Sequence, residues 1–242
     1  MKKGIQLSVS ATLMLCLLAV SGTAQTAEEL LAKMIEAQGG RAVFTGLKDM
    51  TLIGELDLLQ QGMSGAFTIY KKEPNKRKME FEVMGMLITQ CYDGEGVWVT
   101  NPQTGAIEDM PEAQAVDFKR QALPVTIMLD PDKYGVTFVL KDKETIDGKE
   151  YYVLEQTFED DFKMILYVDP DTYLSHQVKS DVADQFGGRS DVVQVLSDFK
   201  KEGGMVMAHS ITTFMDGEEY VRITIEEVEF NTGMEDSLFA RN

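Results

Sequence analysis

The feature that most restricts how this chain can fold is a two-residue alternation of apolar and polar side chains, which recurs between residues 49 and 230. In one stretch, Met79, Phe81 and Val83 alternate with two glutamates. Successive side chains of a β-strand point to opposite faces of its sheet. The alternation therefore indicates a series of half-buried strands.

Turn signals separate these stretches. Asp-Gly pairs stand at 93–94, 147–148 and 216–217, and Gly-Gly pairs stand at 187–188 and 203–204. We count about eleven strands joined mostly by short turns. Parallel strands need long crossovers, whereas antiparallel neighbours can be joined by a few residues. The predicted fold is α+β and mostly β, with an antiparallel meander.

The meander is preceded by one amphipathic helix over residues 26–38. Its apolar side chains recur at helical spacing, Thr26 can cap its first turn, and Glu29 three residues later completes a capping box. The pair Gly39-Gly40 then predicts the end of the helix.

A second helical segment interrupts the meander near residues 111–130. Pro111 suits a first helical position, and Val116, Phe118 and Leu123 follow at loose helical spacing. Because Pro124 breaks the pattern, we expect two short helices bent at that residue. Such an insertion would cover one face or mouth of a curved sheet as a lid, and a cavity would remain beneath it.

The N-terminus has the pattern of a secretory signal peptide. Lys2 and Lys3 precede an apolar run over residues 7–20, and small residues lead to Ala24. The run is shorter than the roughly 20 residues that cross a bilayer, which disfavours a membrane anchor. We expect cleavage after Ala24, so that residues 1–24 form the signal peptide and residues 25–242 form a single exported domain.

A lipoprotein signal is a second alternative for this segment, because Cys16 lies in the apolar run. Lipid attachment requires small residues just before the cysteine, and Met14 and Leu15 stand there instead. Removal of the segment also removes Cys16 and leaves Cys91 as the one cysteine. The mature chain would then have no internal disulfide, although it is exported.

The composition is strongly acidic, with a formal net charge of −17. Loss of Lys2 and Lys3 with the signal peptide would make it more negative. Such a surface repels nucleic acid and anionic lipid headgroups. The simplest explanation of this charge is that it keeps the protein soluble. The charge argues against permanent adsorption to a membrane but not against brief contacts with one.

Several motifs along the chain together resemble those of a known family. In order, they are YDGEGVWVTNPQTG at 92–105, IDGKEYYVLE at 146–155, YVDPDTYL at 167–174, SDFKKEGGMVMAHSI at 197–211 and VEFNTGMEDSLF at 228–239. Together with the opening helix and the inserted lid, their order resembles the LolA/LolB-like superfamily, and more closely the outer membrane lipoprotein-sorting proteins. Many relatives carry a proline where Ala208 stands, a difference that concerns cargo rather than fold.

The resemblance implies an unclosed β-barrel whose concave face, covered by helices, takes up acyl chains. The best-known members of the superfamily carry lipoproteins across the periplasm. The expected partners are therefore lipoprotein or lipid acyl chains, an inner-membrane transporter that loads them and an outer-membrane acceptor. We expect a monomer without a cofactor.

The candidate ligand-binding residues are apolar side chains of the strands and of the lid. Methionine is unbranched and adapts to irregular ligands, and 13 of the 15 methionines lie beyond the signal peptide. The candidates are Met79, Phe81, Met84, Met86, Phe118, Leu123, Ile127, Met128, Met164, Met205 and Met207. The alternative for any single one of them is that it fills the core.

Residues for catalysis or metal binding do not form a recognisable constellation. His176 and His209 lack metal-ligand spacing, and Cys91 has no evident histidine partner. Acidic pairs such as Asp130 and Asp132 lack the spacing of an EF-hand. We therefore expect neither an enzyme nor a metal site.

One basic cluster stands out at residues 76–78, Lys-Arg-Lys. It opens a predicted strand and is either a solvated strand end or a contact for an acidic partner or a lipid headgroup. The leading functional hypothesis is a periplasmic carrier of lipoproteins or lipids. A sensing or regulatory domain of the envelope is the second, and a structural module without a ligand is the third.

Overall fold

The computed structural model describes residues 25–183 and 189–241. The predicted signal peptide, residues 1–24, lies outside the described residues. Within them, no helix is both long and apolar enough to cross a lipid bilayer.

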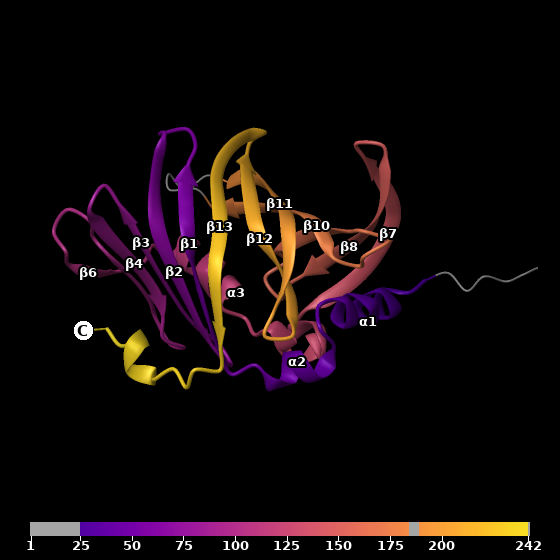
Figure 1. Ribbon diagram of the computed structural model, residues 1–242, viewed down its shortest axis with the longest axis horizontal. Coiled ribbons are helices and arrows are strands. Elements are labelled where there is room, and N and C mark those ends of the chain that lie inside the picture. The colour runs from indigo at the N-terminus through magenta and orange to yellow at the C-terminus, as the bar shows by residue number, and fades with distance from the viewer. Residues whose placement is uncertain (1–24, 184–188, 242) are drawn as a thin grey trace, which may run out of the picture.

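One antiparallel sheet of thirteen strands dominates the structure (Figure 1). Its strands are β1 (Asp49–Leu58), β2 (Met63–Lys72), β3 (Lys76–Val83), β4 (Met86–Tyr92), β5 (Val97–Thr100), β6 (Ile107–Asp109), β7 (Thr137–Ile146), β8 (Lys149–Thr157), β9 (Lys163–Val168), β10 (Ser175–Ala183), β11 (Arg189–Glu202), β12 (Met205–Met215) and β13 (Glu218–Phe230). The predicted fold class, a mostly β protein with an unclosed antiparallel barrel and few helices, is confirmed. The strand count exceeds the predicted eleven, and β5 and β6 have only four and three residues, too few for an alternation to show.

The sheet consists of two meanders joined through one long-range pair. The spatial order runs from β6 back to β1, continues through β13, and ends with β7 at the other edge. In the described part of the sheet, the two halves are hydrogen-bonded to each other through the pairing of β1 with β13. Register shifts, such as the one between Ile53 and Gly54 in β1, add to the twist that curves the sheet.

This topology dictates where the lid must lie. Strand β6 forms one edge of the sheet and β7 forms the other, yet they are consecutive in the chain. The segment between them has to cross from edge to edge. It contains α3 (Glu112–Gln121) and two 3-10 helices, η1 (Val125–Met128) and η2 (Pro131–Tyr134). Helix α3 contacts β5 on one side and β10 on the other, so the crossing segment covers the concave face.

The prediction of two helices bent at Pro124 is correct for the first helix. Helix α3 ends at Gln121, and Pro124 directly precedes the next helical segment. That segment, η1, is a single turn of 3-10 helix rather than an α-helix. Proline lacks the backbone N–H that would continue the α-helical hydrogen-bond pattern.

The opening helix α1 (Ala27–Ala37) has the predicted capping box. The Thr26 hydroxyl accepts a hydrogen bond from the Glu29 backbone N–H, and the Glu29 carboxylate accepts one from the Thr26 N–H. Its buried residues Leu30 and Met34 pack against β8 and β9. A second short helix, α2 (Arg41–Gly46), was not predicted; it buries Phe44.

The outer face of the first meander is covered by the C-terminal segment. This segment ends in η3 (Asp236–Phe239), and Phe239 is fully buried against Cys91 and Trp98. The sole tryptophan is therefore a core residue on the side of the sheet that faces away from the lid.

Candidate functional site

A cavity of about 830 Å³ lies between the lid and the concave face of the sheet. Both halves of the sheet contribute to it. Its apolar lining consists of Phe44, Leu56, Leu58, Met79, Phe81, Leu123, Pro124, Val125, Ile127, Met128, Phe158, Phe162, Met164, Val182, Val192, Met205, Met215, Tyr220, Val221 and Ile223. The volume lies within the range of roughly 300–1,000 Å³ that is typical of small-molecule sites.

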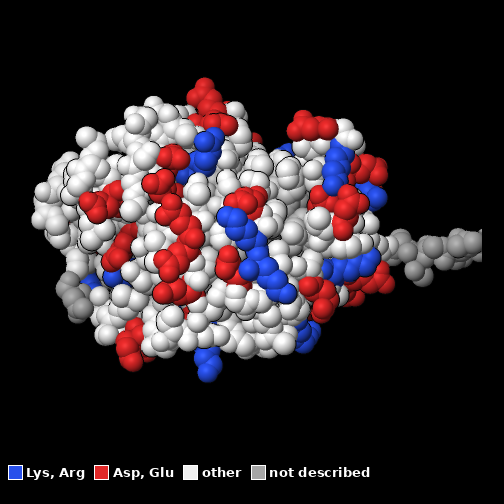
Figure 2. Space-filling model, viewed as in Figure 1, with Lys and Arg blue, Asp and Glu red and all other residues white. Residues whose placement is uncertain are grey.

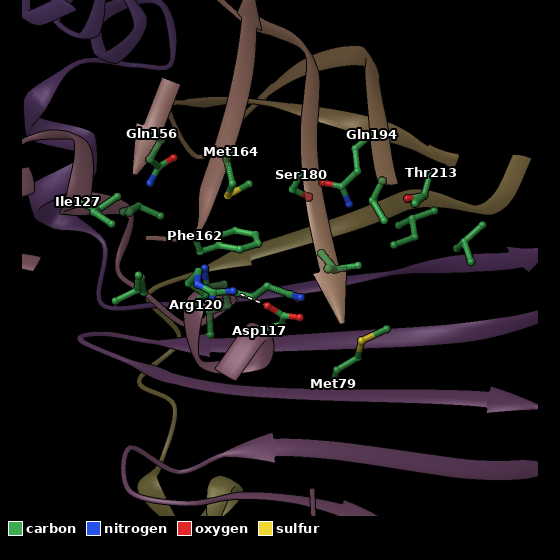
Figure 3. A pocket seen from close by; sticks show the side chains of 18 of the residues that line it. Met79, Asp117, Arg120, Ile127, Gln156, Phe162, Met164, Ser180, Gln194 and Thr213 are labelled. Carbon is green, nitrogen blue, oxygen red and sulfur yellow. Dashed lines mark hydrogen bonds and ion pairs between the residues drawn. The ribbon is translucent and has the colours of Figure 1, made fainter. Parts of the chain in front are cut away.

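The structure brings seven of the predicted ligand-binding residues to this cavity. They are Met79, Phe81, Leu123, Ile127, Met128, Met164 and Met205. Figure 3 shows Met79 on the first half of the sheet facing Met164 on the second half, with the lid residues between them.

Two of the other predicted residues, Met84 and Met86, lie at the hairpin between β3 and β4 rather than at the cavity. Met84 was expected on a strand, but it has a φ of 55° and forms the turn with Gly85. Met84 is 77% exposed, and Met86 is 44% exposed. Neither residue is among those that line the cavity, so these two assignments are corrected.

Of the remaining two, Phe118 is buried and Met207 is half-buried. Phe118 packs with Val97 and Met110, where α3 contacts β5. Met207 packs against the apolar cluster of β1, β2 and β13. Neither residue lines the cavity.

Polar side chains form a line across the second half of the cavity wall. Gln156, Ser180, Gln194 and Thr213 come from β8, β10, β11 and β12 in turn. Their side chains are seen together along one wall in Figure 3. They are neutral groups, which can donate and accept hydrogen bonds without placing a charge in the cavity.

Arg120 fastens the lid to the second half of the sheet. Its guanidinium pairs with Asp117 on the same helix and with Asp160 in the turn between β8 and β9. It also lies 3.7 Å from the centre of the Phe162 ring, a favourable cation–π arrangement. Burial alone raises the pKa of Asp160, but the hydrogen bond and charge of Arg120, together with the hydrogen bond from the Phe162 N–H, outweigh burial and hold the pKa below its ordinary value. We call this set of contacts the Arg120 latch.

The first half of the cavity wall contains a cation, Lys71 of β2. Burial, reinforced by the nearby charge of Arg77, lowers the pKa of Lys71 to about 8, while Glu73 opposes the shift. The Glu73 carboxylate itself accepts a hydrogen bond from the Val125 N–H at 3.3 Å. Burial raises the pKa of Glu73 despite that bond.

The basic cluster at residues 76–78 is not a freely solvated strand end. Lys76 pairs with Asp236 at 3.1 Å, and Lys78 pairs with Glu80 at 2.7 Å. Arg77 points to the other face of β3 and is buried, and burial lowers its pKa to about 10. Its guanidinium lies 4.6 Å from the Phe118 ring centre.

Cys91, His176 and His209 are not among the described residues that line the cavity. Burial raises the pKa of the Cys91 thiol to about 12, so the thiol stays protonated near neutral pH. His209 is 2% exposed, and its Nδ1 lies 3.0 Å from the Ile225 carbonyl oxygen. His176 stacks against Tyr151. Within the described part of the chain, no group of three or more His, Cys, Asp or Glu residues is placed to hold a metal ion.

The polar cavity residues are not among the predicted ones, because the predicted ones are all apolar side chains of the strands and the lid. A signal was nevertheless present. Phe67, Ile69 and Lys71 alternate along β2, which places a lysine on an apolar face, and Gln156 follows Leu154 in the same way on β8. By contrast, no local pattern connects Arg120 with Asp160.

Comparison with solved structures shows how this arrangement relates to known folds. A domain described as an outer membrane lipoprotein-sorting protein, from Vibrio parahaemolyticus, superposes with a TM-score of 0.58 at 15% identity, covering 88% of this chain and 95% of that one. A LolA superfamily protein from Nitrosomonas europaea gives a TM-score of 0.59 at 14% identity, with coverages of 90% and 99%. The chain has a LolA-like fold.

A third structure with this LolA-like arrangement is a DUF1329 family protein from Desulfovibrio piger. It has a TM-score of 0.59 at 15% identity and covers 88% of this chain and 95% of its own. No family model and no curated protein matches the sequence. The likeness therefore lies in the fold and not in the sequence.

Proposed function

We propose that this protein is a non-catalytic periplasmic carrier that holds the acyl chains of lipoproteins or lipids in its cavity and moves them between the membranes of the bacterial envelope. The observation that carries the proposal is the cavity of about 830 Å³ with its predominantly apolar lining. The LolA-like fold supports it, since one structure that shares the fold is described as a lipoprotein-sorting domain.

An acyl chain fits the chemistry of this lining. Each methylene transferred from water to an apolar site contributes about 0.8 kcal/mol. Met79, Met128, Met164, Met205 and Met215 line the cavity from both halves of the sheet and from the lid. Their flexible side chains can adapt to chains of different length and branching.

The lid provides a route for loading and release. It crosses the concave face as a chain of short helical segments, and the Arg120 latch holds it to the second half of the sheet. A loading partner would have to separate these contacts, and an acceptor would have to offer the chain a more favourable site. A carrier of this kind works when it binds the acyl chain more tightly than the loading partner does and less tightly than the acceptor does.

The charge of the outer surface favours transfer over adsorption. On the face seen in Figure 2, acidic side chains outnumber basic ones, and Glu218, Glu227 and Glu229 of β13 are exposed. A negative surface is repelled by anionic headgroups. The protein would therefore bind a membrane transiently rather than remain adsorbed to it.

Filling the cavity tests the proposal. Thr213 lines the cavity, whereas its neighbour Thr212 points to the opposite face of β12. We expect Thr213→Trp to weaken binding of an uncharged fluorescent long-chain alcohol by at least about tenfold, because the indole occupies space that the chain would fill.

Thr212→Trp is the matched control and should bind the same probe as the wild type does. Circular dichroism and denaturant midpoints would establish that both variants fold. If the wild type did not bind the probe, the cavity would not be the carrier site. The same conclusion would follow if the two tryptophan variants bound the probe equally well.

A further inference from the structure

Lys71 is a charged residue on an otherwise apolar part of the concave face. Along β2, Phe67, Ile69 and Lys71 point to the same side of the sheet, and the first two are buried. In the neighbouring strand β1, the residue opposite Lys71 is Met50. The lysine side chain lines the cavity, so a bound molecule can reach it.

The ammonium of Lys71 has no close partner. Within the described part of the chain, no hydrogen bond or ion pair engages it, and its electrostatic neighbours are Arg77 and Glu73. The Glu73 carboxylate is turned to the Val125 N–H of the lid segment. A cation removed from water without a paired anion is unfavourable, which makes this position one that an anion would stabilise.

Arg77 adds a second positive charge at the same place. It stands directly opposite Lys71 in the β2–β3 pairing, an arrangement that is destabilising for like charges. Its side chain is 7% exposed, and Nη1 is buried without a hydrogen-bond partner. Two cations, one of them with an unsatisfied donor, thus stand opposite each other on neighbouring strands.

The other cation of the cavity differs in this respect. Arg120 is paired with both Asp117 and Asp160. Among the described residues that line the cavity, Lys71 and Arg120 are the two cations, and only Lys71 lacks an ion-pair partner. The lid is therefore not held closed by an ion pair of Lys71.

We propose that the cavity selects amphiphiles that carry an anionic group, a carboxylate or a phosphate, and that this group binds to the Lys71 ammonium beside Arg77 while the alkyl chain lies along the apolar wall. The inference rests on the proposed carrier function and narrows its ligand class. A neutral amphiphile would fill the same space but would leave the two adjacent cations uncompensated. Hydrogen bonds between charged partners are the strongest that such a site can form.

Three probes with twelve carbon atoms each test this directly: laurate, dodecyl phosphate and dodecanol. Affinities are measured by isothermal titration calorimetry on the full mature protein after delipidation. We expect the wild type to bind at least one of the two anions more tightly than dodecanol. Lys71→Met should weaken binding of that anion by about 10- to 100-fold, the effect expected from a lost charge-assisted hydrogen bond. Binding of dodecanol should not weaken.

Two further variants complete the design. Lys71→Arg keeps the charge and should retain most of the preference for the anion. Lys201→Met removes the same charge from an exposed position on β11 and should leave all three affinities unchanged. Because Lys71→Met removes a buried cation from beside Arg77, it should raise rather than lower the denaturant midpoint, so weaker binding would not reflect unfolding.

The outcomes separate this inference from the function on which it rests. A preference for laurate over dodecyl phosphate would point to fatty acids, and the reverse preference to phosphorylated lipids. Equal binding of all three probes, with no effect of Lys71→Met, would overturn the anion site and leave the carrier in place. Failure of every probe to bind would overturn both.

Discussion

Asp49 is a single residue that ties the C-terminal segment to the sheet. It is the first residue of β1 and is buried. Its carboxylate accepts hydrogen bonds from the backbone N–H groups of Thr232, Gly233 and Met234 and from the Thr232 hydroxyl. Burial alone would raise the pKa of Asp49, but these hydrogen bonds outweigh it and hold the pKa below its ordinary value of 3.8.

The first prediction concerns this carboxylate. Asp49→Asn should lower the free energy of unfolding by about 1–3 kcal/mol, because the amide retains one acceptor oxygen and leaves N–H donors unsatisfied. Since the folded state favours the ionised carboxylate, the difference between wild type and variant should be constant above pH 3.8 and shrink as the pH falls below that value.

Urea denaturation measured at several pH values checks this. Glu227→Gln, which removes an exposed carboxylate from β13, is the control and should change the stability little at any pH. A loss of stability in Asp49→Asn that did not depend on pH would show that the charge of Asp49 contributes nothing.

At the scale of single residues, the sequence predicted apolar cavity residues where strand alternation was long and regular. Met79, Phe81 and Met164 fall in such stretches and line the cavity. The prediction failed at Met84 because a two-residue hairpin turn interrupts the alternation there. It also failed at Phe118, since the orientation of a short helix depends on which strands it packs against.

At the scale of elements, the lid combines one α-helix with two single turns of 3-10 helix. Such short segments have little intrinsic stability and depend on tertiary contacts. Helix α3 is held to β5 by the packing of Phe118 with Val97 and to the β8–β9 turn by the Arg120 latch. Release of either contact should increase the population of an open lid.

Arg120→Ala is expected to loosen the lid without unfolding the sheet. Loss of the charged hydrogen bonds should favour opening by about 1–2 kcal/mol, roughly a 5- to 30-fold change in the equilibrium. Hydrogen exchange of the backbone amides of α3 should become faster, while exchange in β11 and β12 should not change.

Lys119→Ala removes a neighbouring exposed cation from the same helix and serves as the matched control. The account of the latch would be wrong if the two variants accelerated exchange in α3 equally, because the effect would then arise from helix charge and not from the contacts of Arg120.

The sequence predicted the elements that obey local rules. The capping box of α1 and the proline before η1 are local features, and the structure has both. Helix α2 was missed because its six residues are too few for helical periodicity to be visible. The Arg120 latch joins residues 40 positions apart in the chain, and no local pattern reports such a contact.

At the scale of the whole molecule, the order of the strands determines the site. Among the described strands, the two meanders pair with each other through β1 and β13, which leaves β6 and β7 at opposite edges (Figure 1). The chain must cross the concave face to connect them, and that crossing encloses the cavity. Turn signals predict a meander, but they do not predict that its first strand pairs with its last.

The central claim is that the enclosed space holds acyl chains, and native mass spectrometry with lipid extraction tests it most directly. The mature protein would be purified from a bacterial periplasm without detergent, beside Thr213→Trp as the variant with a filled cavity. We predict that the wild type carries acyl species and that Thr213→Trp, with its fold intact, carries far less. A wild-type protein that is empty on purification, and that takes up neither lipid nor lipoprotein when these are supplied, would contradict the account.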